Sequence, residues 1–127
     1  MSQTFVISRH KALRAGTHDD LYLSTTEDCL DFFAWAIPKG FPTEKGVKHL
    51  AIKVGNHSPE TTYFEGSIPE GQYGAGTKEL WDEGTYIPYS PIVATQRPIR
   101  VDFFGSKIIE TYYLKWWSGP RWLIWRA

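Results

Sequence analysis

The residues with the clearest chemical potential are His18 and Asp20, two positions apart, and a second histidine, His10, shortly before them. Side chains at positions i and i+2 of a β-strand lie on the same face, so His18 and Asp20 are close enough to share one divalent cation. Imidazole and carboxylate together suit Mn, Zn or Fe better than Ca. His10 on a neighbouring strand would complete three ligands and leave positions open for substrate. Ordinary solvated surface side chains remain the alternative.

Short β-strands must position these side chains. Aromatic residues make up 16% of the 127 residues and suit a pleated, half-buried surface. Eight prolines and eleven glycines leave no stretch after Ile37 suited to a long helix, although a helical turn is possible over Thr26–Leu30. The predicted strands are Phe5–His10, His18–Leu23, Phe32–Ile37, Lys48–Val54, Thr62–Glu65, Lys78–Trp81, Ile99–Phe104, Ile108–Trp117 and Trp122–Arg126.

This pattern predicts an all-β fold in which residues 1–127 form a single domain. A domain of many short strands favours a closed or partly closed barrel of mostly antiparallel strands, because closure hides the sheet edges. Side-chain alternation then predicts which residues face the interior. The expected interior residues are Phe5, Ile7, Asp19, Leu21, Leu23, Leu50, Ile52 and Val54. The opposite, solvent-reachable face is expected to carry His10, His18, Asp20, His49, Lys53 and His57.

Composition argues against several other classes of protein. The formal net charge is zero, so overall charge gives no reason to expect nucleic-acid binding. A single cysteine, Cys29, excludes an internal disulfide and a cysteine-based zinc cluster. No apolar run approaches the roughly 20 residues that cross a bilayer, and the first residues lack a signal-peptide pattern. We therefore expect a cytoplasmic protein that does not bind membranes.

Two glycine-containing stretches are also candidates for a site. The stretch from Phe64 to Gly76 is rich in glycine, and Pro69 excludes a helix across it. Tight turns between strands are favoured over a phosphate-binding loop, because no lysine follows as in a P-loop. The stretch from Ala34 to Gly40 places Lys39 at a strand end, where it could reach an anionic substrate, although most loop lysines are simply solvated.

Taken in order, these stretches resemble the 3′-phosphoesterase module of the bacterial and archaeal DNA ligase D family. The resemblance covers nearly the whole chain. It is strongest from Phe64 to Gly76, which is close to identical to the family's Phe-Glu-Gly-x-Ile-Pro-Glu-Gly-x-Tyr-Gly-Ala-Gly. The other matching segments are Ser8–His10, His18–Leu23, Trp35–Gly40, Lys48–Ile52, Asn56–His57, Leu80–Gly84 and Pro120–Arg126.

The resemblance implies a β-barrel that prepares DNA 3′ ends for nonhomologous end joining. Such a domain removes a terminal 3′-ribonucleoside and then a 3′-phosphate with Mn²⁺, although another divalent metal such as Zn²⁺ is compatible. By the same resemblance His10, His18 and Asp20 are the metal ligands, His57 contacts the scissile phosphate, and Lys39 is the lysine of the Pro-Lys-Gly motif. The expected partners are primer-template 3′ ends and, in trans, ligase or polymerase proteins.

Several residues around the expected phosphate depart from the family pattern. Tyr22 and His49 stand where the family has arginine, Gly55 replaces a glutamate, and Thr61 replaces a tyrosine. Neither tyrosine nor histidine reproduces the bidentate guanidinium fork. The remaining candidate phosphate ligands are His57, Lys39, His49 and Arg14, with Arg9 as a further replacement. Two alternatives therefore stay open: a catalytically weak or inactive barrel that binds nucleic-acid ends or a partner, and a metal-dependent phosphoesterase for another substrate.

Overall fold

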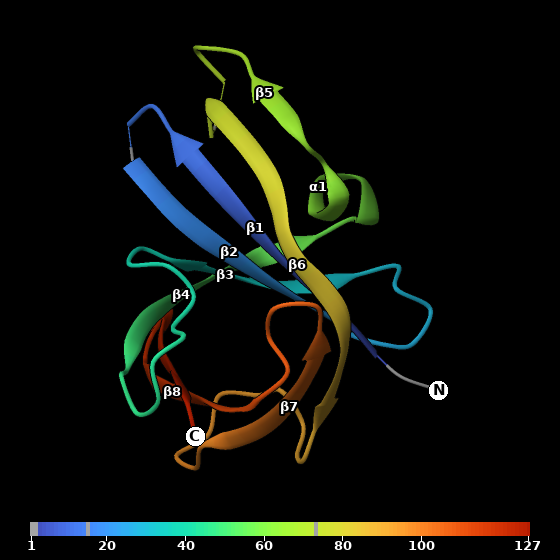
Figure 1. Cartoon of the computed structure of the whole chain (residues 1–127), viewed down its shortest axis with the longest axis vertical. Helices are drawn as coiled ribbons and strands as arrows, with labels where there is room; N and C mark the ends of the chain where they lie inside the picture. Colours follow the sequence, from blue (N-terminus) through green and yellow to red (C-terminus); the bar gives the residue numbers. More distant parts are fainter. Residues whose placement is uncertain (1–2, 15, 73) are drawn as a thin grey trace.

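In a computed structural model, which describes residues 3–14, 16–72 and 74–127, the strands form one sheet that closes into a barrel (Figure 1). The elements are β1 (Gln3–Ala12), β2 (Gly16–Ser24), β3 (Phe32–Ile37), β4 (His49–His57), α1 (Pro59–Tyr63), β5 (Gly66–Ile68), β6 (Gly76–Pro88), β7 (Ile99–Gly105), β8 (Thr111–Ser118) and β9 (Arg121–Arg126). Eight of these strands form a closed antiparallel barrel in the order β1-β2-β3-β4-β9-β8-β7-β6, and pairing of β6 with β1 completes it. The predicted all-β barrel is confirmed.

Alternate side chains of the strands fill the interior of the barrel. Phe5 and Ile7 of β1 and Leu21 and Leu23 of β2 are buried in this interior cluster, as predicted. The largest side chains with almost no exposure are aromatic, and Trp35 packs edge-on against a second tryptophan from β9. Aromatic pairs of this kind add stability beyond their buried area. The interior is therefore an apolar core rich in aromatic side chains.

A second, smaller cluster lies on the outer face of the barrel. It consists of Val6, Tyr22, Phe32 and Ala34, which are buried although they alternate with the interior residues. Helix α1 lies beside this cluster, and Tyr63 of the helix packs against Phe32 with 5.9 Å between the ring centroids. The outer face is thus partly shielded from water. No helix in the described part of the chain is long and apolar enough to cross a membrane.

Helix α1 replaces part of a predicted strand. Thr62–Glu65 was expected to be extended, but it covers the end of α1 and the turn after it. The reason is local: Ser58 caps the helix by accepting a hydrogen bond from the backbone N–H of Thr61, and proline occupies the first helical turn. The predicted helical turn over Thr26–Leu30 is also wrong. That segment is a tight turn in which Cys29 has a φ of 57°.

The interior face predicted for β4 is wrong. Ala51 is buried in the interior cluster and is the cross-strand partner of Trp122, which also faces inward. Because cross-strand partners share a face, His49 lies on the inner side opposite Ile124. Lys53, the partner of the interior Trp35, lies on the same side. The outward-facing residues are therefore Leu50, Ile52 and Val54.

A β-bulge in β4 reverses this alternation before the strand ends. Ala34 pairs with Val54 and Phe32 pairs with His57. Between these two pairs β4 contains one more residue than β3. Such an insertion re-aims the side chains that follow it. His57 therefore lies on the outer face, as predicted, but because of the bulge and not because of a regular pleat.

Asp82 of β6 holds the connection between β7 and β8. Its buried carboxylate accepts the backbone N–H groups of Ser106, Lys107 and Ile108 at 2.8 to 3.0 Å, and that of Glu83 at 2.9 Å. These contacts fix residues 106–108 in a turn. The strand predicted to start at Ile108 consequently begins only at Thr111.

Gly84 lies where β6 passes from β1 to β7, and it allows a close approach of the backbone. It pairs with Phe5 on one side and Gly105 on the other, and a Cβ at this position would overlap the carbonyl oxygen of Phe104. We expect Gly84→Ala to lower the free energy of unfolding by about 2–3 kcal/mol, the usual cost of overpacking. Urea denaturation measures this. Gly55→Ala is the control, because its Cβ would meet no atom within 4 Å; equal losses in both variants would contradict the prediction.

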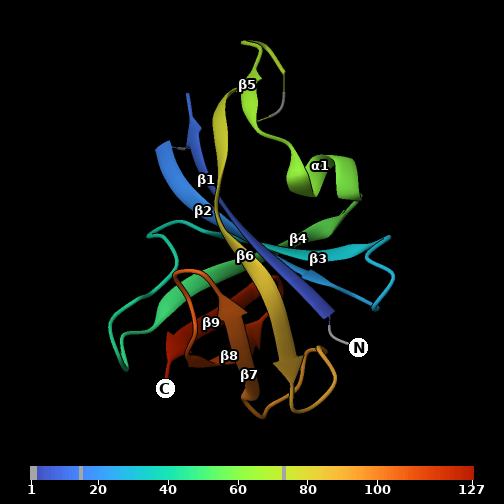
Figure 2. The same cartoon turned by 45° about the vertical axis from the view of Figure 1, so that its right-hand side comes forward.

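One end of β1, β2 and β6 projects beyond the part of the barrel formed by β7, β8 and β9. Both views show this projection, with β5 lying along β6 and α1 below it (Figures 1 and 2). The projecting ends contain His10 of β1 and His18 of β2. The candidate ligands are thus outside the apolar core, on a three-stranded extension of the barrel.

Candidate metal centre and phosphate site

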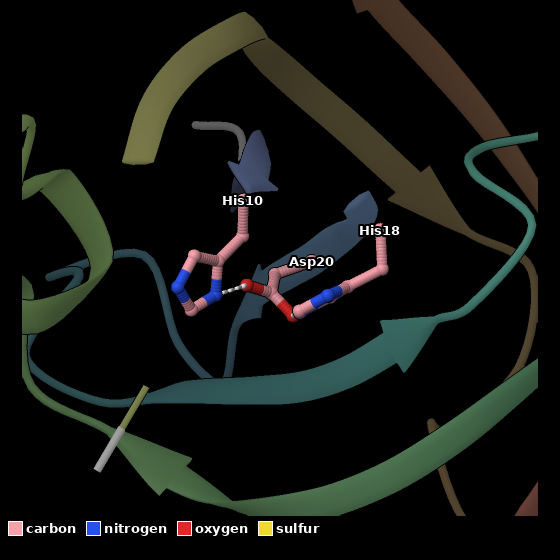
Figure 3. Close-up of side chains that lie close together, drawn as sticks. All are labelled: His10, His18 and Asp20. Atoms are coloured by element: carbon pink, nitrogen blue, oxygen red, sulfur yellow. Dashed lines mark ion pairs between the residues drawn. The ribbon is translucent and has the colours of Figure 1, made fainter. Parts of the chain in front are cut away.

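Three side chains of the β1–β2 hairpin converge on the outer face: His10, His18 and Asp20 (Figure 3). His10 and His18 are cross-strand partners with ring centroids 4.8 Å apart. The Asp20 carboxylate lies between them, with one oxygen 3.7 Å from His10 Nδ1 and the other 3.3 Å from His18 Nε2. One ligand atom of each residue lies within 4.8 Å of the other two. Two imidazoles and a carboxylate at this spacing can hold a divalent cation.

Backbone carbonyls orient both imidazoles for this role. His10 Nε2 is 2.7 Å from the carbonyl oxygen of Gly74. Since a carbonyl only accepts hydrogen bonds, Nε2 carries the proton and Nδ1 points its lone pair towards Asp20 in the neutral ring. His18 Nδ1 lies 3.4 Å from the carbonyl oxygen of Gly16, which directs Nε2 to Asp20. Metal-binding histidines in proteins are usually oriented in this way, so the donor set fits a divalent cation.

Gly74 also shows what the glycine-rich stretch contributes. The stretch forms β5 and the connection into β6, which agrees with its predicted role as a turn between strands. Gly74 has a φ of 76°, and a side chain there would press on the His10 ring. The stretch therefore brings a carbonyl group onto a candidate ligand.

The site is more enclosed than expected from its place on the outer face. His10 is only 8% exposed, and the side chains of His18 and Asp20 are 14% and 16% exposed. Gly74 contacts the His10 ring, so this part of the outer face is less open than the alternative of ordinary solvated side chains implies. The hydrogen bond from His18 to Asp20 raises the pKa of His18. Partial burial strengthens this charge interaction.

His57 and Tyr22 continue the site along the outer face. Their rings meet edge to face with centroids 5.5 Å apart, and His57 Nδ1 is buried with no hydrogen-bond partner in the described chain. Burial lowers the pKa of His57, and the charge of Lys78 lowers it further. The imidazole is therefore neutral at pH 7 and offers one N–H donor and one acceptor. Burial also raises the pKa of Tyr22, which keeps its hydroxyl protonated.

Lys78 of β6 belongs to the same face and was missed in the sequence. It is the cross-strand partner of His10 and is 6% exposed. Its Nζ donates to the Tyr22 hydroxyl at 2.9 Å and to the Thr61 carbonyl at 2.7 Å. The signal for this position is alternation: Lys78 shares a strand face with Leu80, which packs against the outer cluster.

The other predicted phosphate ligands are not part of this group. Lys39 and Arg14 are exposed in turns at the ends of strands. His49 donates from Nδ1 to the Gly40 carbonyl at 2.6 Å, on the inner side of the barrel. Arg9 is held by the buried Asp19 through bonds of 3.0 and 3.3 Å. A phosphate role for these residues stays a prediction, and for His49 it conflicts with the face on which the residue lies.

Comparisons with known proteins identify a family for this chain. A family profile described as "DNA Ligase D 3'-phosphoesterase domain" matches residues 8–115. The chain is 39% identical over 122 residues to "Multifunctional non-homologous end joining DNA repair protein LigD" of Mycobacterium tuberculosis, covering 94% of this chain and 15% of that protein. It is 34% identical over 127 residues to the Mycolicibacterium smegmatis "Multifunctional non-homologous end joining protein LigD", covering 94% of this chain and 16% of that protein. The chain thus spans about one sixth of the length of these curated relatives.

Proposed function

The chain belongs to the DNA ligase D 3′-phosphoesterase domain family, and on this premise we propose that it is a Mn²⁺-dependent enzyme that processes 3′ ends in nonhomologous end joining. Its substrates are DNA ends that carry a 3′-phosphate or a terminal ribonucleoside. Its products are 3′-hydroxyl ends that a ligase or polymerase acting in trans can use. In 3′-phosphate removal, water adds to phosphorus, the bond to the 3′-oxygen breaks, and that oxygen takes a proton.

The observation that carries the proposal is the convergence of His10, His18 and Asp20 on one point outside the apolar core. His10 Nδ1, His18 Nε2 and a carboxylate oxygen of Asp20 would hold the cation. A divalent cation at this place supplies Lewis acidity for phosphoryl oxygens and lowers the pKa of a nearby hydroxyl. Three protein ligands leave positions for substrate, as a catalytic site requires.

His57 contacts the phosphate. Burial lowers its pKa and so favours the neutral ring in the free protein, and this ring donates one N–H to a phosphate oxygen. Partial burial excludes competing water, so this hydrogen bond gains strength. The Gly74 carbonyl keeps the His10 ring in a single tautomer during the reaction.

Turnover of a defined DNA end tests the proposal. A primer-template with a 3′-phosphate or a single 3′-ribonucleotide is incubated with the protein and Mn²⁺, beside His10→Ala and His57→Ala. We expect 3′-hydroxyl ends from the wild type and none from His10→Ala. Absence of turnover with every divalent metal tried, but with binding of the end retained, favours a non-catalytic end-binding barrel. Hydrolysis of p-nitrophenyl phosphate without any change in the DNA favours a phosphoesterase for another substrate.

Metal binding is expected to stabilise the fold. A cation that binds only the native state at 100 times its dissociation constant adds about 2.7 kcal/mol, so Mn²⁺ should raise the Tm by several degrees and EDTA should reverse the change. Protons compete for His18, whose pKa is raised by Asp20. The Mn²⁺-dependent rise should therefore be larger at pH 8 than at pH 5.5. Differential scanning fluorimetry measures both; an equal rise in His10→Ala would show that Mn²⁺ binds elsewhere.

A further inference from the structure

The ammonium group of Lys78 is largely buried and forms no ion pair with a described residue. The side chain lies beside His10 across the β1–β6 pair and is 6% exposed. No carboxylate oxygen of a described residue lies within 4.0 Å of its Nζ. Buried lysines in proteins are almost always paired. A lysine held in this position without an ion-pair partner can therefore receive an anionic ligand.

The contacts of Lys78 leave hydrogen-bond donors available for such a ligand. Two of its three N–H groups point to the Tyr22 hydroxyl and the Thr61 carbonyl. The third remains free for an acceptor. Tyr22 accepts from Lys78, so its own hydroxyl hydrogen can be donated elsewhere. The pair thus offers two donors on the face that carries His57 and Asp20.

A hollow in the surface gives a ligand access to Lys78. It measures about 300 Å³ and lies between α1 and β5, on the side of β6 away from the barrel interior. Its lining combines Phe64 and Ile68 with Glu60, Thr61 and Lys78. A strand end that enters here meets two apolar side chains, the buried ammonium group of Lys78 and, on α1, the carboxylate of Glu60.

We propose that Lys78, anchored by Tyr22, is the residue that binds the terminal phosphate of the substrate. The proposal rests on the proposed function for the identity of the substrate, a nucleic-acid 3′ end. Tyr22 stands on β2 where the family resemblance predicts an arginine, and it carries no charge. The positive charge for the phosphate comes instead from Lys78 on β6, on the other side of β1 from Tyr22. The hydrogen bond from Lys78 to the Tyr22 hydroxyl holds the ammonium group beside the position of the family's arginine.

Binding of two matched DNA ends tests this assignment without turnover. Fluorescence anisotropy compares a primer-template ending in 3′-phosphate with one ending in 3′-hydroxyl, in EDTA. The wild type should prefer the phosphate, and Lys78→Met should reduce that preference by about 10- to 100-fold, the usual range for one charge-assisted hydrogen bond. Lys115→Met is the control, because Lys115 is a partly buried strand lysine bonded to a backbone carbonyl on the distant β8. It should keep the preference.

A double variant tests whether β2 can supply the positive charge in place of β6, across β1. Tyr22→Arg combined with Lys78→Met should regain much of the phosphate preference that Lys78→Met loses. If Lys78→Met does not fold, as judged by near-UV circular dichroism, Lys78→Gln removes the charge and keeps N–H donors for Tyr22 and Thr61. An unchanged preference in the neutral variants, or no preference in the wild type, overturns the assignment.

Turnover separates this inference from the proposed function. Wild-type turnover together with an unchanged KM for the 3′-phosphate end in Lys78→Met refutes the role of Lys78 and leaves the enzyme intact. No wild-type turnover, together with a phosphate preference that depends on Lys78, refutes the enzyme and leaves Lys78 as the anion-binding residue of an end-binding barrel.

Discussion

Asp20→Asn is expected to lower turnover of a 3′-phosphate end by about 10³-fold or more while the barrel stays folded. The Asp20 carboxylate lies between His10 Nδ1 and His18 Nε2 and is the only anionic ligand of the three. Asparagine has the same shape but no charge, so the cation loses its strongest attraction. A metal ion contributes several kcal/mol to the stabilisation of charge in the transition state, and each 1.36 kcal/mol changes the rate tenfold.

Asp102→Asn is the matched control for this variant. Asp102 also lies on a strand and is 17% exposed, against 16% for Asp20, but it is on β7 and bonds to Thr111, Tyr89 and Arg100. Its loss should leave turnover per folded molecule unchanged. Single-turnover kinetics with quantified 3′-hydroxyl product measures both variants. Activity of Asp20→Asn within tenfold of the wild type would remove the basis for a metal centre at this place.

Asp82→Ala is expected to cost about 4 kcal/mol of unfolding free energy, which is a large part of the roughly 5–15 kcal/mol by which native proteins are stable. The change leaves the N–H groups of residues 106–108 without their carboxylate acceptor, and Ile108 is buried. Hydrogen bonds to a charged group contribute about 1.5–3 kcal/mol each, and water replaces only the more exposed ones. Losses above 4 kcal/mol are rare for single substitutions and indicate a broken buried network.

Glu83→Ala provides the comparison on the same strand. Glu83 is the next residue, carries the same charge and is exposed, so its loss should change stability by less than about 0.5 kcal/mol. Chemical denaturation followed by tryptophan fluorescence gives both values. A loss below about 1 kcal/mol in Asp82→Ala would show that the turn at residues 106–108 does not depend on the carboxylate.

The sequence predicts the barrel well where the strands alternate regularly. Phe5, Ile7, Leu21 and Leu23 face the interior as expected, because one buried face imposes a period of two on apolar residues. The same rule fails in β4. There both faces are partly covered, Ala51 alone marks the interior, and three larger apolar residues lie outside. Size is a poor guide to the inner face when α1 and the outer cluster bury the other face as well.

Some residues of the candidate site could be predicted from local sequence, whereas others depend on contacts between distant parts of the chain. His10, His18 and Asp20 lie on adjacent strands of one hairpin, so spacing and parity are enough to bring them together. The position of His57 on the outer face depends on a β-bulge, and the sequence of β4 alone does not predict that bulge. Lys78 depends on the closure of the barrel, since its partner His10 is far away in the sequence. A lysine among alternating residues looks like an ordinary solvated side chain until the strand beside it is known.

The candidate site combines residues from a local hairpin with a residue from a distant strand. We therefore expect its parts to form at different stages of folding. The β1–β2 hairpin brings the three candidate metal ligands together through contacts between residues close in the chain, and such contacts form within microseconds. Pairing of β1 with β6 joins residues far apart, and such contacts form late because loop closure must come first. If the proposed metal site is correct, a nascent or partly refolded chain would bind the metal ion on the hairpin before Lys78 of β6 is in place. Cation capture would then precede competence for a DNA end, and addition of Mn²⁺ early in refolding would speed the formation of the native state.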